Sequence, residues 1–251
     1  QGREGSILGT PAQIEADRRT LRIYNSKQVQ AAIDELVAWY EKDPVAELPD
    51  ARKTLRRAAE AMAMAQTFGV VAADPDRSQA LWGTTGPHSW GDLVVPVEGV
   101  MIDNPDNIYR SIPIDGAASY VIEGRVVHAA PVQQTMVLHN EKSGADPNQK
   151  VRSQEVENGA VSLDAIAVAR DGTFTVTVDS SPVNGRTNHL QSDPAVHDAY
   201  ILVRDSLSDW SRQNAVQLNV RRISGPPVKS LRSDAELAAK AATLTGNVGR
   251  Y

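Results

Sequence analysis

The 251-residue chain contains no cysteine. This absence excludes disulfides, thiolate metal sites, iron–sulfur clusters and a cysteine nucleophile. It does not decide the compartment, because a cysteine-free chain suits the cytoplasm and the periplasm alike. We expect one of these two, with the cytoplasm preferred.

The sequence also lacks a surplus of positive charge, long apolar runs and a secretion signal. Its net charge is −5, and Lys and Arg are scattered among acidic residues, so no basic patch indicates nucleic-acid binding. No apolar run approaches the roughly 18 residues of a membrane span, and the N-terminus has no signal pattern. We therefore expect neither a nucleic-acid nor a membrane partner. The length suffices for one large or two modest domains.

Cofactor and triad motifs are absent as well. Neither G-x-G-x-x-G nor a P-loop occurs, so a nucleotide cofactor has no sequence support. No G-x-S-x-G elbow surrounds Ser206 or Ser208, which disfavours a serine hydrolase. The five histidines show no recognisable ligand spacing. We expect no cofactor and no metal, with a mononuclear site among the histidines as the alternative.

Residues 1–73 are expected to be helical. Pro11 opens a helix over 11–24, Asn25-Ser26 caps a second helix that ends before Pro44, and a third is expected over 49–69. The second helix carries apolar residues at a spacing of 3.6, which indicates one buried face. They are Val29, Ile33, Leu36, Val37 and Tyr40.

From Asn107 the apolar period becomes two, which is typical of strands. The first strand ends at Asp115-Gly116, and 120–127 is expected as its hairpin partner. The pair Asp171-Gly172 is the strongest hairpin signal in the chain. Before Asn107, the Gly-, Pro- and Trp-rich stretch indicates a long ordered connection or a set of short strands. Further strands are expected at 135–140, 161–169, 173–179, 200–209 and 216–223.

Several antiparallel strands joined by short turns indicate a sandwich rather than a parallel sheet. We predict an α+β fold in which an N-terminal helical segment spans 1–73 and an antiparallel β-sandwich, jelly-roll-like, spans 74–228. A C-terminal helix and tail follow over 229–251. The polar stretch 141–159 is expected to be an exposed excursion between strands.

The C-terminal helix has a clear start. Ser233 and Glu236 have the spacing of a capping box, and the Ala-rich helix that follows is expected to run to about Leu244.

Two charged residues fall on apolar strand faces. Arg110 shares a face with Ile108 and Ile112, and Asp205 shares a face with Val203. A buried ion needs a partner, because desolvating an isolated charge is costly. We expect each to be paired, and they are candidates for each other. The pair is either structural, or Arg110 holds a carboxylate or oxyanion of a ligand.

Next to this arginine, three Asx residues precede the strand. Asn104, Asp106 and Asn107 can bond their own backbone and lock a corner. Tyr109 lies on the face opposite Arg110, and a Tyr hydroxyl at the mouth of a cavity is a suitable acid or hydrogen-bond donor.

Two histidine-bearing segments are further candidates. "GPHSWG" places His88 and Trp90 together, which suits binding of an aromatic or sugar ring, with an incidental surface loop as the alternative. "LHNE" places His139 and Glu141 on one strand face, where the carboxylate would raise the pKa of the imidazole.

Three segments together resemble the bacterial domain-of-unknown-function 1214 family. They are "DNPDNIYRSIPIDGAASYVIEGRV", "RDGTFTVTVDSS" and "AYILVRDSLSDWSRQNAVQLNVRRISG". The resemblance covers roughly residues 80–225. It implies an all-β jelly-roll-like domain flanked by helices, in a family whose members often occur among bacterial catabolic genes. Relatives often continue further after the C-terminal helix, so an extension or a second subunit would complete any shared site there.

We therefore expect a cofactor-independent catabolic enzyme, a lyase in preference to a hydrolase, that acts on a small aromatic or ring-shaped substrate such as a lignin-derived compound. The predicted catalytic residues are Tyr109, His88 and Arg110. The predicted substrate-binding residues are Trp90, Asn104, Asn107, His139, Arg204 and Trp210. One alternative is a non-catalytic module that binds carbohydrate or an envelope partner. Another is an assembly protein that forms a homodimer through its N-terminal helices.

Overall fold

A computed structural model describes residues 6–83, 85–99, 104–139 and 157–250. The chain first forms α1 (Pro11–Tyr24) and α2 (Lys27–Tyr40). Each helix begins at a hydroxyl side chain, Thr10 or Ser26, that accepts a hydrogen bond from a backbone N–H of the first turn. This is the usual device for satisfying free donors at a helix start, and it confirms both predicted helices.

A short 3-10 turn, η1 (Pro44–Glu47), leads into α3 (Pro49–Ala72). The predicted stop at Gly69 is wrong, because the helix continues through this glycine for three more residues. Phe68 and Val70 are buried on either side of it. The helix is then capped from a distant segment, since Nη2 of Arg232 donates to the carbonyl oxygen of Ala73 at 2.6 Å.

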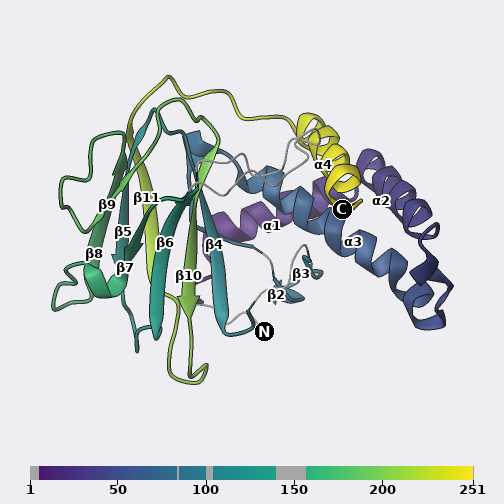
Figure 1. The fold of residues 1–251 in the computed structure, drawn as a ribbon, viewed down its shortest axis with the longest axis horizontal. Helices are drawn as coiled ribbons and strands as arrows, with labels where there is room; N and C mark the ends of the chain where they lie inside the picture. The colour runs from purple at the N-terminus through teal and green to yellow at the C-terminus, as the bar shows by residue number, and fades with distance from the viewer. Residues whose placement is uncertain (1–5, 84, 100–103, 140–156, 251) are drawn as a thin grey trace.

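The predicted capping box is confirmed at the start of α4 (Asp234–Val248), which runs past the predicted end at Leu244. This helix packs on α2 and α3 (Figure 1). Segments from both ends of the sequence thus form one helical cluster. Its buried residues are Ile23, Val29, Ile33, Leu36, Ala59, Ala63, Val70, Leu237, Ala238 and Ala241.

The strands form a sandwich of two sheets, with the helices to one side of it (Figure 1). After the 3-10 turn η2 (Pro75–Arg77), the described strands are β1 (Leu81–Trp82), β2 (His88–Trp90), β3 (Leu93–Val95), β4 (Asn107–Ile114), β5 (Ser119–Arg125), β6 (Gln133–His139), β7 (Glu157–Ser162), β8 (Thr173–Asp179), β9 (His189–Gln191), β10 (Ala199–Ser206) and β11 (Gln217–Ser224). One sheet has the order β1-β4-β10-β6-β7, the other β11-β5-β8-β9, and β2 with β3 forms a separate hairpin. We call the first sheet A and the second sheet C.

Neither predicted Asp-Gly pair joins two paired strands of one sheet. The Asp115-Gly116 turn joins β4 of sheet A to β5 of sheet C, and β4 pairs with β10 and β1 instead. Because β4 and β5 lie in facing sheets, Ile112 of β4 and Ile122 of β5 are buried in the same core between them. The Asp171-Gly172 turn does close, since the N–H of Gly172 donates to the Ala169 carbonyl oxygen at 2.9 Å and the N–H of Ala169 donates to the Thr173 carbonyl oxygen at 2.8 Å. The residues before this turn form no strand, however, and β8 pairs with β5 and β9. A tight turn fixes only local geometry.

The strand predicted over 161–169 is shifted. The structure has β7 over Glu157–Ser162, followed by the 3-10 turn η3 (Leu163–Ala165). Residues beyond η3 carry the chain from sheet A to sheet C. Most of the predicted excursion over 141–159 lies outside the described residues.

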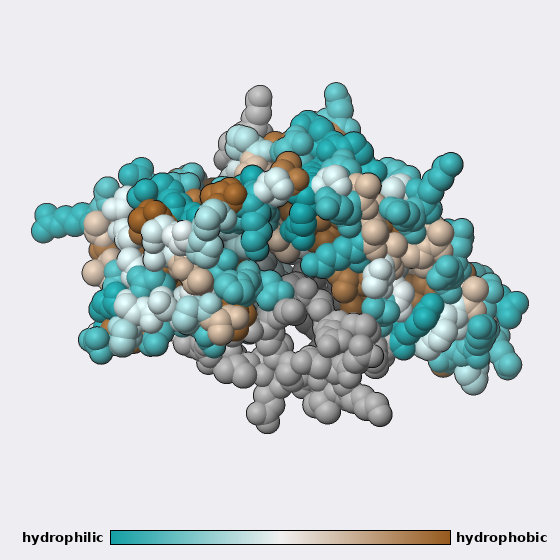
Figure 2. Space-filling model, turned by 90° about the horizontal axis from the view of Figure 1, so that it is seen from above, coloured by the Kyte–Doolittle hydropathy of each residue, from teal (hydrophilic) through white to brown (hydrophobic). Residues whose placement is uncertain are grey.

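The face of the molecule seen in Figure 2 is mostly hydrophilic, and its apolar residues form small scattered patches. Among the described helices, none combines the length and apolar character needed to cross a membrane.

Candidate functional site

The predicted partnership between Arg110 and Asp205 is confirmed. Nη2 of Arg110 donates to Oδ2 of Asp205 at 2.6 Å, and Nη1 donates to the carbonyl oxygen of Val216 at 2.8 Å. The side chains are 4% and 0% exposed. Burial raises the pKa of Asp205, an effect that the Arg110 charge opposes. The pair fastens β4 and β10 to the segment that leads into β11.

This burial leaves Arg110 no open side from which to hold a ligand. Both of its Nη atoms bond protein oxygens, and only Nε has no hydrogen-bond partner among the described residues. Gln134, which lies opposite Asp205 in the β6–β10 pairing, is also buried, and its amide group has no partner within the described parts of the chain. The surroundings of Arg110 are those of the sandwich interior.

The outer face of sheet A brings together four of the predicted site residues. The side chain of Asn104 accepts the N–H of Asp106 at 2.9 Å, and the N–H of Asn107 reaches the Asn104 carbonyl oxygen at 3.1 Å, so the predicted Asx turn is confirmed. The hydroxyl oxygen of Tyr109 then accepts two hydrogen bonds, from Asn104 N at 3.2 Å and from Asn107 Nδ2 at 3.0 Å. Because the oxygen is held by two donors, its own proton is available for donation.

Arg204 completes this group. It lies directly opposite Tyr109 in the β4–β10 pairing, and side chains of directly opposed residues emerge on the same face with Cβ atoms about 5 Å apart. Arg204 is exposed and forms no ion pair within the described residues. Leu202 emerges two residues away on the same face. We call Asn104, Asn107, Tyr109, Leu202 and Arg204 the outer-face site.

His88 and Trp90 belong to a different cluster, around a carboxylate that the sequence did not single out. Asp17 on α1 is fully buried and accepts a hydrogen bond from Trp90 Nε1 at 2.7 Å and one from Gln13 Nε2 at 3.1 Å. His88 Nε2 lies 3.5 Å from the same carboxylate, and its Nδ1 lies 3.2 Å from Thr85 Oγ1.

Trp82 closes the cluster. Its ring centroid lies 4.9 Å from that of His88. Its backbone N–H donates to Gln13 Oε1 at 2.7 Å, and its carbonyl oxygen accepts from Gln13 Nε2 at 3.1 Å. The polar atoms of this cluster thus bond one another and hold α1 against β1 and β2, which favours a fastening role over contact with substrate. We call Gln13, Asp17, Trp82, His88 and Trp90 the helix latch.

A sequence signal for the latch existed in α1. Gln13, Asp17 and Thr20 recur at a helical spacing and share the buried side of α1 with Ala16 and Ile23. Polar residues on the buried side of a short helix require partners elsewhere.

Other predicted residues lie apart from both groups. His139 stacks on its cross-strand neighbour Tyr200, with ring centroids 4.8 Å apart. Its expected partner Glu141 lies outside the described residues. Trp210 is 56% exposed, in the loop between β10 and β11. Within the described parts of the chain, no three His, Asp or Glu side chains form a group that could hold a metal ion.

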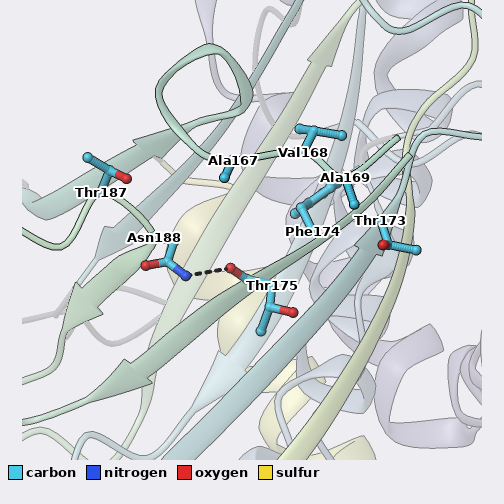
Figure 3. Close-up of a pocket in the computed structure, with 8 residues that line it drawn as sticks. All are labelled: Ala167, Val168, Ala169, Thr173, Phe174, Thr175, Thr187 and Asn188. Carbon is cyan, nitrogen blue, oxygen red and sulfur yellow. Dashed lines mark hydrogen bonds between the residues drawn. The ribbon is translucent and has the colours of Figure 1, made fainter. Parts of the chain in front are cut away.

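Two cavities lie at the opposite edge of the sandwich, near β7, β8 and β9. The larger, of about 510 Å³, is lined by residues 167–169, 173–175 and 187–188 (Figure 3). The smaller, of about 350 Å³, includes Arg186, Thr187 and His189 in its lining. Arg110 lines neither cavity.

Comparisons with known proteins identify the fold but no activity. No family model matches the chain, and no curated protein matches it significantly. An uncharacterised protein from Burkholderia cenocepacia aligns over 95% of this chain and 60% of its own length, with a TM-score of 0.64 and 16% identity. The VPA0106 protein from Vibrio parahaemolyticus aligns over 47% of this chain and 31% of its own, with a TM-score of 0.34 and 12% identity. The chain spans less than two thirds of either structure.

Proposed function

We propose that the protein is a cofactor-independent enzyme, a lyase in preference to a hydrolase, that acts on a small ring-shaped substrate bearing a carboxylate, such as a lignin-derived aromatic acid. The observation that carries this proposal is the outer-face site. There the Tyr109 oxygen accepts two hydrogen bonds, and Arg204 stands opposite on the same face.

Arg204 supplies the substrate anchor in this proposal. An arginine fork matches a carboxylate with two parallel hydrogen bonds, and Arg204 forms no ion pair with any described residue. The ring of the substrate would then lie along the strand over Leu202, which is half-buried. Apolar surface combined with a few polar or charged groups is the usual composition of a small-molecule site.

Tyr109 supplies the proton in this proposal. Asn104 and Asn107 fix the position of its oxygen, so the hydroxyl proton can be directed to an oxygen that gains negative charge as a substrate bond breaks. In the lyase step a carbon–oxygen bond breaks as a double bond forms. The phenolate that remains, stabilised by the same two donors, takes up the proton that the neighbouring substrate carbon loses, which restores the tyrosine. His88, which we predicted as a second acid or base, lies in the helix latch and is left out of this step.

A thermal-shift screen followed by turnover assays tests the proposal. Aromatic acids, their alcohol analogues and lignin-type dimers are compared, because a ligand at 100 times its Kd adds about 2.7 kcal/mol of stability. Tyr109→Phe should lower turnover at least tenfold, and Arg204→Gln should raise KM for acids only. Tyr40→Phe and Arg212→Gln are the matched controls. Full activity in Tyr109→Phe would eliminate the assignment of Tyr109.

We also propose that the chain is a divergent member of the domain-of-unknown-function 1214 family. The proposal is supported by the sequence motifs that include Asn104, Tyr109 and Arg204. These motif residues are the ones that meet in the outer-face site.

A further inference from the structure

A second site is suggested by the two cavities at the β8–β9 edge, which share Thr187 in their linings. We call the two cavities together the edge groove. It lies on the side of the sandwich away from the helices (Figure 1). Volumes of about 510 and 350 Å³ are each in the range of natural small-molecule sites.

The groove is not open to an added peptide strand. Along its wall, the carbonyl oxygen of Thr173 accepts the N–H of Ala169 at 2.8 Å, and that of Thr175 accepts Nδ2 of Asn188 at 3.0 Å (Figure 3). An incoming strand needs such backbone groups free. The occupant must therefore be recognised by side chains.

Those side chains are hydroxyls and an amide beside an apolar wall. Thr175 and Thr187 are exposed, and neither hydroxyl contacts another side chain by a hydrogen bond within the described residues. Val168, which is 40% exposed, provides apolar surface next to them, and Phe174 lies buried beneath the cavity (Figure 3). A ligand with an apolar ring face and hydroxyl groups at its rim, such as a sugar, matches this combination.

The smaller cavity adds a positive charge. The guanidinium of Arg186 is fixed in place, because Nη2 donates to Ser181 Oγ at 2.9 Å and to the Pro182 carbonyl oxygen at 2.7 Å. Nε donates to the Val183 carbonyl oxygen at 3.2 Å. Nη1 has no such contact to a described residue, and a fixed arginine is well suited to a carboxylate.

We propose that the edge groove binds a short oligosaccharide that contains uronic acid, with hydroxyl groups on Thr175, Thr187 and Asn188 and a carboxylate on Arg186. The site is independent of the outer-face site and does not rest on the proposed enzymatic function.

Isothermal titration with a galacturonic acid trimer and a galactose trimer tests the inference. Arg186→Gln should weaken binding of the acidic trimer at least tenfold, since a hydrogen bond to a charged group contributes about 1.5–3 kcal/mol, and should leave the neutral trimer unchanged. Thr187→Trp, at an exposed position shared by both cavities, should abolish binding of both. Arg57→Gln, the same charge change on the exposed face of α3, should change nothing.

Three results would overturn the inference. One is failure of the folded wild-type chain to bind the acidic trimer at about 10 mM, a far weaker range than ordinary specific binding. Another is equal affinity of wild type and Arg186→Gln for the acidic trimer. The third is undiminished binding of both trimers by Thr187→Trp. This variant also serves as the test if Arg186→Gln fails to fold.

Discussion

Trp82 and Arg110 lie directly opposite each other in the pairing of β1 with β4. Trp82 contacts the ring of His88 in the helix latch, and Arg110 bonds Asp205 inside the sandwich. The latch and the buried ion pair are therefore adjacent, and together they connect α1 to the core of the sandwich. The Trp90 indole N–H and both Nη atoms of Arg110 are bonded to protein oxygens.

Breaking the buried ion pair should destabilise the fold strongly. Replacing Arg110 by Met leaves the Asp205 charge buried without a partner, and we expect a loss of about 3–5 kcal/mol in the free energy of unfolding. The double variant Arg110→Met with Asp205→Leu should lose much less, because no orphaned charge remains. Urea denaturation measures both. Glu123→Gln, in the exposed pair with Arg221, is the control and should cost less than about 1 kcal/mol.

Removing the central carboxylate of the helix latch should reduce stability rather than turnover. In Asp17→Ala the Trp90 indole N–H loses its acceptor, and an orphaned buried donor costs about 1–3 kcal/mol. Denaturation and turnover are measured on the same preparation. Asp34→Ala, at an exposed carboxylate on α2, is the matched control. A large fall in turnover at full stability would show that the latch takes part in catalysis.

Asp234 should make the protein more stable at neutral than at acidic pH. Hydrogen bonds from Arg22 and then Arg19 hold the pKa of Asp234 below its ordinary value of 3.8. A carboxylate with a lowered folded-state pKa stabilises the fold above its unfolded pKa, and the contribution disappears as the pH falls through the folded-state pKa. Between pH 5 and pH 2, roughly, Asp234→Asn should therefore lose less stability than wild type, by under about 1 kcal/mol because the pair is partly exposed.

Adding one methyl group at Gly124 should disturb the floor of the edge groove. A Cβ there would overlap the ring of Phe174, which lies across the glycine on the neighbouring strand. Overpacking of this kind costs about 1–3 kcal/mol. Gly86→Ala, where nothing lies within 4 Å of the added atom, is the control for thermal unfolding. Equal melting temperatures for the two variants would contradict the expected overlap.

Sequence reasoning predicted elements well where the signal is local. Thr10 and Ser26 start helices because each hydroxyl can satisfy donors in its own first turn. The turn at Asn104 is predictable for the same reason. The turn at Asp115-Gly116 is likewise predictable. Which strand pairs with β4 is not, because it depends on the apolar residues of many strands that meet across the sandwich.

The candidate sites divide in the same way. The pairing of Arg110 with Asp205 could be predicted from sequence because each is a charged residue on an apolar strand face. A buried charge needs a partner of opposite sign, and the strand pattern offers few such partners. Asp17 was missed because its partner Trp90 is supplied by a segment distant in sequence. The edge groove was missed because its threonines are ordinary strand and loop residues whose proximity arises only from the β8–β9 pairing.

The position of α4 has a consequence for the order of folding. The cluster of α1, α2 and α3 is completed by a helix that follows all the sandwich strands in the chain. During synthesis the first three helices must therefore wait, with apolar surface uncovered, until the sandwich has been made. Contacts between segments so distant in sequence slow folding and lengthen the time for which the apolar faces of the N-terminal helices stay exposed to aggregation.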